Sequence, residues 1–216
     1  MKNRMLKGAH LSERKCREIV NLFCEDLTAT QIAAITGVSR VTINAYLKMI
    51  RTRLAMYCDE AFPLQHLPEN HISLFHSTNG LPRTLFFGFT RWNGLVYSTG
   101  LMEMTKENLI SWQKQHSGEI KHQMSAIQAV ADFTNWRLYR RDIISSANGK
   151  LSSDDISGFW GLTRSRLMKF RGLNRNTLYL HIKECEFRYN YRNENMQLKL
   201  MQMIQKQPLH EMQLQA

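Results

Sequence analysis

The chain has 216 residues, of which 43% are hydrophobic, 22% charged and 10% aromatic. These fractions are ordinary for a globular protein and exclude a wholly disordered or collagen-like chain. Lys and Arg number 29 against 18 Asp and Glu, so the formal net charge is +11 and a polyanion is the first partner to consider.

Membrane and secretory classes fit the sequence poorly. No stretch approaches about 18 consecutive apolar residues, so we expect no membrane span and no membrane partner. The basic start MKNRMLKGAHLSERK is followed by no apolar segment, so we expect no signal peptide. The four cysteines are scattered without a C-x-x-C pair, which favours reduced thiols over disulfides or a zinc site. The sequence therefore predicts a cytoplasmic protein that binds nucleic acid.

Residues 1–60 are expected to form a helical head. Apolar residues recur there at spacings of three and four, and Ser12 is expected to cap the first helix. Pro63 and Pro68 favour a linker over residues 61–70. Helices are expected over three segments: Leu11 to Phe23, Ala29 to Thr36, and Arg40 to about Tyr57.

The segment LTATQIAAITGVSRVTINAYLKMIR, residues 27–51, has the pattern of a helix-turn-helix. Ala33 is small where the two helices would touch, and Gly37 tolerates the positive φ of the turn. Ser39 is expected to cap the second helix. The apolar positions that would pack the pair are Ile32, Val38, Ile43 and Tyr46.

The outward face of that second helix is a candidate surface for DNA. Its residue types suit phosphate contact, pairing with an adenine edge and methyl contact in a major groove. The candidate residues are Ser39, Arg40, Val41, Thr42, Asn44 and Lys48. A plain helical hairpin used for packing or dimerisation has the same two-helix pattern and is the alternative.

From residue 71 the period changes to that of short strands. We expect strands within HISLFH, TLFFGFTRW and LVYSTGLM, and a hairpin turn at Asn93-Gly94. Strands first and helices after predict an α+β or mixed α/β core over residues 71–206, with residues 207–216 as a tail. Three segments follow the hairpin: a helix from Lys106 to Gln115, an apolar stretch from Met124 to Val130, and helical periodicity from about Ser153 to Lys206.

A second candidate surface lies in the basic segment near the C-terminus. Between Gly158 and Lys183 the chain has no acid, and apolar residues interleave the basic ones. Solvated charged faces usually mix signs, so this segment favours contact with phosphates. The candidate contacts are Arg164, Arg166, Lys169, Arg171 and Arg175.

The segment ISGFWGLTRSRLMKFRGLNRNTLYLHIKECEFRYNYRNEN, residues 156–195, resembles the C-terminal part of bacterial insertion-sequence transposases of the ISXO-like class. The head segment LTATQIAAITGVSRVTIN and the segment RTLFFGFTRWNGLVYSTGL are also similar to that family. The resemblance implies an RNase H-like domain behind a helix-turn-helix head that binds element ends on double-stranded DNA as a homo-oligomer. It also implies DDE-type strand cleavage and transfer, in which three carboxylates hold two Mg²⁺ or Mn²⁺ ions.

The chain departs from this family at all three acids. The positions that match the family's carboxylates are Phe75, Thr134 and Ser157. The candidate acids for a shifted site are Glu69, Asp132 and Asp154. Asp132 would share a face with Thr134 if both lay in one strand, and Asp154 would share a face with Ser157 if the helix already ran there.

Catalytic geometry tolerates only about 0.5 Å of error, so the simpler interpretation is a transposase-derived chain whose metal site is lost. Four outcomes stay open from the sequence. The chain is a transposase-family protein with impaired catalysis, a non-catalytic DNA-binding regulator, an active recombinase with shifted acids, or an unstable pseudogene product.

Overall fold

The structure, a computed structural model, describes residues 11–61, 84–102, 104–114, 127–140, 154–169, 174–206 and 209. The chain forms two compact units, Met1–Tyr57 with Tyr191–Ala216, and Cys58–Asn190. The first boundary lies close to the expected end of the head at residue 60. The second domain was expected to continue to residue 206, whereas residues from Tyr191 onward belong to the compact unit that contains the head.

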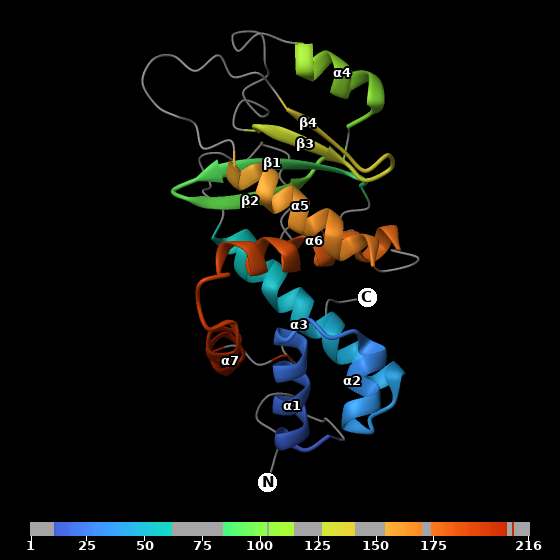
Figure 1. The fold of residues 1–216 in the computed structure, drawn as a ribbon, viewed down its shortest axis with the longest axis vertical. Helices are drawn as coiled ribbons and strands as arrows, with labels where there is room; N and C mark the ends of the chain where they lie inside the picture. The colour runs from blue at the N-terminus through green and yellow to red at the C-terminus, as the bar shows by residue number, and fades with distance from the viewer. Residues whose placement is uncertain are drawn as a thin grey trace. The chain divides into compact units, whose positions relative to one another are not determined.

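The described part of the first unit consists of α1 (Glu13–Cys24), α2 (Ala29–Thr36), most of α3 (Arg40–Glu60) and α7 (Met196–Lys206) (Figure 1). The three head helices were predicted from apolar spacing and are confirmed. Ser12 caps α1 as expected, since its Oγ accepts a hydrogen bond from the Lys15 backbone N–H at 3.3 Å. α1 buries one apolar stripe at spacings of three and four: Cys16, Ile19, Val20 and Phe23.

The partner of α1 on one side is α7, which comes from the far end of the chain. α7 packs against α1, and the side-chain amide of Gln197 donates to Asn21 Oδ1 at 2.7 Å. Periodicity identifies a helix here but not the surface it covers, which is why the sequence placed it with the second domain. The apolar residues that α7 buries are Leu200, Met201, Met203 and Ile204.

The longest described helix is α3, with 21 residues, and its last three residues, Cys58–Glu60, belong to the second unit. Charged residues recur along it, as in the run LKMIRTR. Within the ranges that the structure describes, no helix combines the length and the apolar character needed to cross a bilayer.

The second unit contains a four-stranded antiparallel sheet. Its strands are β1 (Phe86–Trp92), β2 (Leu95–Gly100), β3 (Ala129–Asp132) and β4 (Arg137–Arg140), in the order β2-β1-β3-β4. Because each described pairing is antiparallel and the helices lie on the faces, the architecture is α+β rather than mixed α/β. The strand expected within HISLFH lies outside the described residues.

The hairpin at Asn93-Gly94 is confirmed. Trp92 pairs with Leu95, and both turn residues have positive φ, 48° and 78°, as a two-residue type I′ turn requires. β4 was not predicted, because its sequence RLYR is short and half-exposed and carries no alternation of apolar and polar residues.

Helices cover both faces of the sheet, as Figure 1 shows. On one face, Leu109 and Trp112 of α4 (Lys106–Lys114) pack into a cluster with Leu101, Ile127 and Val130. On the other face lie α5 (Asp154–Met168) and α6 (Arg175–Asn190), both of which contact β2. Successive residues of a strand point to opposite faces, so one strand contributes to both layers.

The layer beneath α5 and α6 is aromatic. Phe89 and Phe159 meet edge to face with ring centroids 4.8 Å apart, and Phe87 contacts Phe133 in the same geometry at 5.6 Å. Phe159 also lies edge-on to Tyr189 of α6, at 5.7 Å. Edge-to-face pairs of this kind fix the relative placement of α5, α6 and the sheet.

A cluster of buried charges joins α6 to the end of α3 within the second unit. Asp59 accepts hydrogen bonds from the Tyr179 hydroxyl at 2.8 Å and from Lys183 Nζ at 2.9 Å. Lys183 Nζ also lies 3.0 Å from Oε2 of Glu186, which accepts a further bond from the Ser98 backbone N–H at 2.9 Å. Burial alone would lower the pKa of Lys183, but the carboxylates of Asp59 and Glu186 outweigh it and raise that pKa well above its usual value.

Candidate nucleic-acid interface

The turn between α2 and α3 is built by the residues that the sequence singled out. Gly37 ends α2 in the left-handed conformation, with φ of 68°, and its N–H donates to the Ala33 carbonyl at 3.0 Å. Ser39 Oγ accepts a hydrogen bond from the Thr42 backbone N–H at 3.2 Å and lies 2.9 Å from the Thr42 hydroxyl. α3 therefore begins at Arg40 with its first turn capped.

The inner side of this helix pair is apolar, as expected. Ile32 and Ile43 are fully buried, and Tyr46 is 5% exposed. The thiol of Cys16 in α1 donates to the Tyr46 hydroxyl oxygen at 3.5 Å. Burial, with this contact to Cys16, raises the pKa of Tyr46 well above its usual value, so its hydroxyl is neutral.

The outer side of α3 carries the candidate DNA-contacting residues. Arg40, Val41, Asn44 and Lys48 are all exposed. At 3.6 residues per turn they fall within an arc of about 100°, and Arg40 and Lys48 are about 12 Å apart along the helix axis. Beyond Lys48 the same side of the helix becomes buried, beginning with Thr52. The exposed face of α3, meaning these four residues, is thus confined to its first turns.

Three polar side chains of this face are available to bind a ligand. Within the described residues, the side chains of Arg40, Asn44 and Lys48 make no hydrogen bond or ion pair. On α1, by contrast, Lys15 pairs with Glu18 and Arg17 pairs with Glu13, each at 2.8 Å. The candidates Ser39 and Thr42 differ from the other four, since their hydroxyls already bond each other and Thr42 is half-buried.

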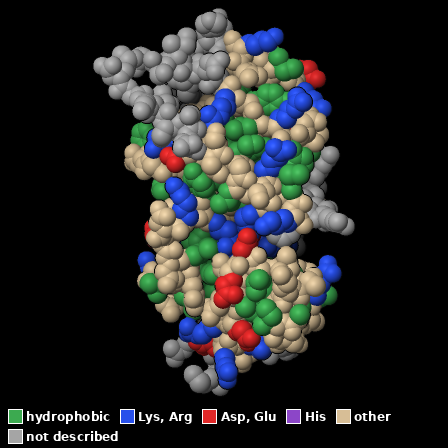
Figure 2. Space-filling view, in the orientation of Figure 1, with side chains coloured by type: hydrophobic (Ala, Val, Ile, Leu, Met, Phe, Trp, Pro, Cys, Tyr) green, Lys and Arg blue, Asp and Glu red, His purple; other side chains and the backbone are tan. Residues whose placement is uncertain are grey.

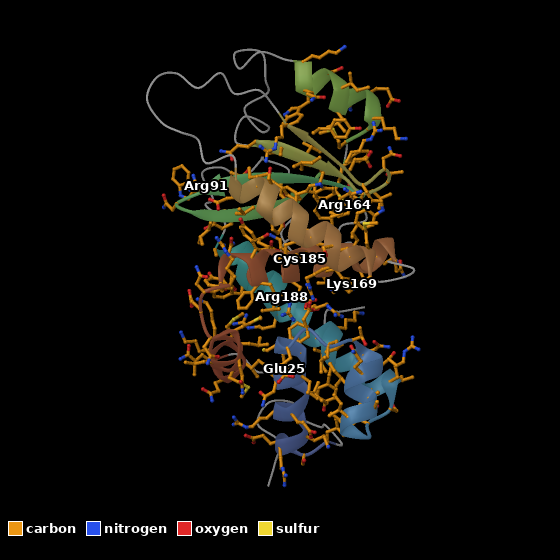
Figure 3. The ribbon with its side chains drawn as sticks, viewed as in Figure 1. Glu25, Arg91, Arg164, Lys169, Cys185 and Arg188 are labelled. Carbon is orange, nitrogen blue, oxygen red and sulfur yellow. The ribbon has the colours of Figure 1, made fainter. Side chains whose placement is uncertain are left out.

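Two of the residues expected to contact phosphate in the second unit are exposed. Arg164 and Lys169 lie toward and just after the C-terminal end of α5, and neither side chain has a partner among the described residues (Figure 3). Figure 2 shows Lys and Arg side chains over the face of the second unit that carries α5, with few acids among them. Arg171 lies outside the described residues, as does the side chain of Arg175.

The expectation that Arg166 contacts phosphate was wrong. Its side chain is buried, with 8% of the residue exposed, and donates to Glu184 Oε1 at 2.9 Å. Arg188 donates to the same oxygen at 2.9 Å, and Arg166 Nη1 lies 3.4 Å from Cys185 Sγ. The acid that neutralises Arg166 comes from the next helix, so the acid-free stretch in the sequence gave no sign of it.

The positions that match the family's acids do not lie in a carboxylate site. Thr134 is exposed in the turn between β3 and β4. Ser157 is exposed on α5, and its hydroxyl accepts a hydrogen bond from the Arg140 guanidinium. A guanidinium at this position repels a metal cation rather than binding one. Phe75 lies outside the described residues.

Among the shifted acids, Asp132 has a structural role. It is fully buried at the end of β3, and Oδ1 accepts from the Thr134 N–H at 2.7 Å while Oδ2 accepts from Asn135 Nδ2 at 2.9 Å. Asp132 and Thr134 do not lie in one strand, because β3 ends at Asp132 and the chain turns, so the condition for a shared strand face is not met. Glu69 and the side chain of Asp154 lie outside the described residues.

Metal-binding clusters were sought across the described part of the chain. There, no group of three or more His, Cys, Asp or Glu side chains is placed to hold an ion. Sequence reasoning also missed the ion pair between Arg91 and Asp155, whose atoms lie 2.7 Å apart and which ties β1 to α5. Its partners are 64 residues apart in the chain, so no local pattern points to it.

No known protein family, curated protein or solved structure matches this chain. The candidate interface therefore rests on its own geometry: a capped turn, an exposed arc at the start of α3, and cationic side chains that pair with no other described residue.

Proposed function

We propose that this chain binds double-stranded DNA through the exposed face of α3, in the manner of a helix-turn-helix protein. The observation that carries the proposal is that Arg40, Asn44 and Lys48 are exposed on one arc and make no bond within the described residues. An exposed Asn between two cations adds nothing to the packing of the head. The same three groups suit an adenine edge flanked by phosphates.

Electrostatics support the same partner. The net charge of +11 favours association with a polyanion, and Arg164 and Lys169 add cations on the second unit. Cations of this kind release counterions from the duplex when they bind, so the affinity depends steeply on salt. Double-stranded DNA is favoured over a single strand because the face is helical and presents no exposed aromatic ring on which bases would stack.

The resemblance to ISXO-like transposases extends the proposal to the ends of a mobile element as the target, and to a homo-oligomer as the binding form. An RNase H-like identity for the second unit belongs to the same expectation. The described sheet supports only the coarser α+β architecture.

Within this proposal, a non-catalytic DNA-binding protein is favoured over an active recombinase. Asp132, one of the three substitute acids, uses both carboxylate oxygens to hold the turn after β3. At the position of the family's third acid, Ser157 accepts from Arg140. Both observations oppose a pair of divalent cations, which needs carboxylate oxygens facing a shared space.

Binding is tested with the full chain and a duplex selected from a random pool. Arg40→Ala and Lys48→Ala should each weaken binding and reduce the slope of log K against log salt concentration by about one. Arg14→Ala is the matched control, because Arg14 is exposed on α1 in the same unit and has no partner among the described residues. Equal losses in all three variants would show non-specific attraction and contradict an interface on α3.

Catalysis is tested on the same duplex with Mg²⁺ or Mn²⁺ added. The proposal predicts no nicking at any metal concentration. Metal-dependent nicking that disappears in Asp132→Asn, in a variant that still folds, would overturn the non-catalytic assignment and restore the shifted site.

A further inference from the structure

Val41 stands out on the exposed face of α3. It is 80% exposed, more than any other large apolar side chain in the described part of the chain; Leu198 follows at 58% and Ile35 at 57%. A single exposed apolar residue is unremarkable by itself. The position of Val41 matters because it lies at the edge of the arc of exposed polar groups, about 20° beyond Lys48 around the helix.

The rise along α3 between Val41 and Asn44 is comparable with the distance between neighbouring base pairs. Three residues of α-helix rise about 4.5 Å and turn through about 300°, so the two side chains lie about 60° apart on the same side. Successive base pairs of duplex DNA are about 3.4 Å apart along each strand. A helix that presents Asn44 to one base pair in the major groove therefore presents Val41 to a neighbouring one.

The chemistry of Val41 selects one base. In the major groove the 5-methyl group of thymine is the apolar feature, whereas guanine, cytosine and adenine present donors and acceptors that an exposed valine would leave unpaired. Valine is also stiff, since one χ1 rotamer dominates in a helix, so little side-chain entropy is lost on contact.

We propose that Val41 contacts the 5-methyl group of a thymine in the base pair next to the adenine that Asn44 recognises. This inference rests on the proposed DNA binding and deepens it by naming the bases. The target of the head therefore contains two neighbouring A·T pairs, one recognised by hydrogen bonds and the other by its methyl group.

The test is a double-mutant cycle between the protein and the DNA, with the full chain and the selected duplex. Each thymine of the duplex is replaced in turn by uracil, which removes only the methyl group. At one position, the wild type should lose about fourfold in affinity, the ratio that corresponds to burial of about one methyl group. Val41→Ala should show the same loss with thymine and no further loss with uracil.

Leu198→Ala is the matched control, because Leu198 is an exposed apolar residue on α7 of the same unit. This variant should respond to uracil as the wild type does. The inference is overturned if uracil weakens Val41→Ala and the wild type equally at each position, or if the selected duplex has no thymine beside the pair that Asn44→Ala relaxes. Failure of the proposed function looks different, since the wild type would then select no sequence at all.

Discussion

Lys183 Nζ lies 2.9 Å from Oδ1 of Asp59, and both side chains are buried from solvent. Glu186 Oε2 lies 3.0 Å from the same nitrogen, so one buried ammonium serves two carboxylates in the core of the second unit. Buried ion pairs are costly to form and costlier to break, because removal of one partner leaves the other charge uncompensated. This arrangement fixes the C-terminal end of α3 against α6.

Lys183→Met should lower the free energy of unfolding by about 3–5 kcal/mol, because Asp59 and Glu186 would remain buried without their cation. Urea unfolding followed by circular dichroism measures the change. Lys15→Met is the control, since its pair with Glu18 is partly exposed and should contribute less than about 1 kcal/mol. Similar losses in both variants would show that the buried cluster has no special role.

Arg164→Ala and Arg166→Ala should separate DNA binding from stability. Arg166 is buried against Glu184, so its loss should destabilise the fold by about 3 kcal/mol or more. Arg164 is exposed and has no partner in the described part of the chain, so its loss should leave stability unchanged and weaken DNA binding at low salt. Unfolding curves and binding isotherms for the two variants are the measurements. A stable Arg166→Ala would contradict the described packing of α5 on α6.

Stability should fall at alkaline pH. Burial raises the pKa of Cys185 from 9.0 to about 11, although Arg166 opposes the shift, and burial also raises the pKa of Cys58 and of Tyr179. Between pH 9.0 and about 11 the unfolded chain loses the Cys185 proton while the folded chain keeps it, so stability decreases as pH rises through this window. The urea midpoint, measured across this range, should decline less steeply in Cys185→Ala. An unchanged decline would show that Cys185 does not contribute.

Replacing each of two glycines by alanine should change the stability of the chain in opposite directions. Gly37 has a φ of 68° and open space around an added Cβ, so Gly37→Ala should cost about 1 kcal/mol through the backbone alone. Gly161 lies within α5, also with open space, so Gly161→Ala should stabilise the chain by about 1 kcal/mol. Thermal unfolding of the two variants measures both effects. Unchanged or higher stability in Gly37→Ala would contradict the left-handed turn before α3, and a loss in Gly161→Ala would contradict the open helical position of that glycine.

Local rules explain what the sequence predicted well. The Ser12 cap, the left-handed Gly37 and the Asn93-Gly94 hairpin each depend on a few neighbouring residues, and all three are confirmed. The bounds of α2 were also predicted correctly; Thr28 caps its start, and Gly37 ends it in the left-handed conformation.

Contacts between distant segments explain what the sequence missed. The assignment of α7 to the first unit depends on α1, which precedes it by more than 170 residues. Arg166 looked available because its counter-ion Glu184 lies on another helix. Asp132 stayed open as a substitute acid because the end of β3 could not be located from the sequence. For α7 and for Arg166, periodicity gave the helix but not the helix that packs against it.

Within the candidate site too, local patterns predicted one part and missed another. The exposed face of α3 was predicted, since it is the complement of a buried stripe on one helix. The commitment of Ser39 and Thr42 to the cap reduces the six head candidates to four with free side chains or an exposed apolar group.

The central claim, that α3 recognises duplex DNA, is tested most directly by the selectivity of Asn44→Ala. The measurement is the ratio of affinities for the selected duplex and for a duplex of the same composition in scrambled order, at one salt concentration. We expect a high ratio for the wild type and a loss of roughly 1–3 kcal/mol of discrimination in Asn44→Ala, with the affinity for the scrambled duplex unchanged. An unchanged ratio in Asn44→Ala would contradict recognition by this face.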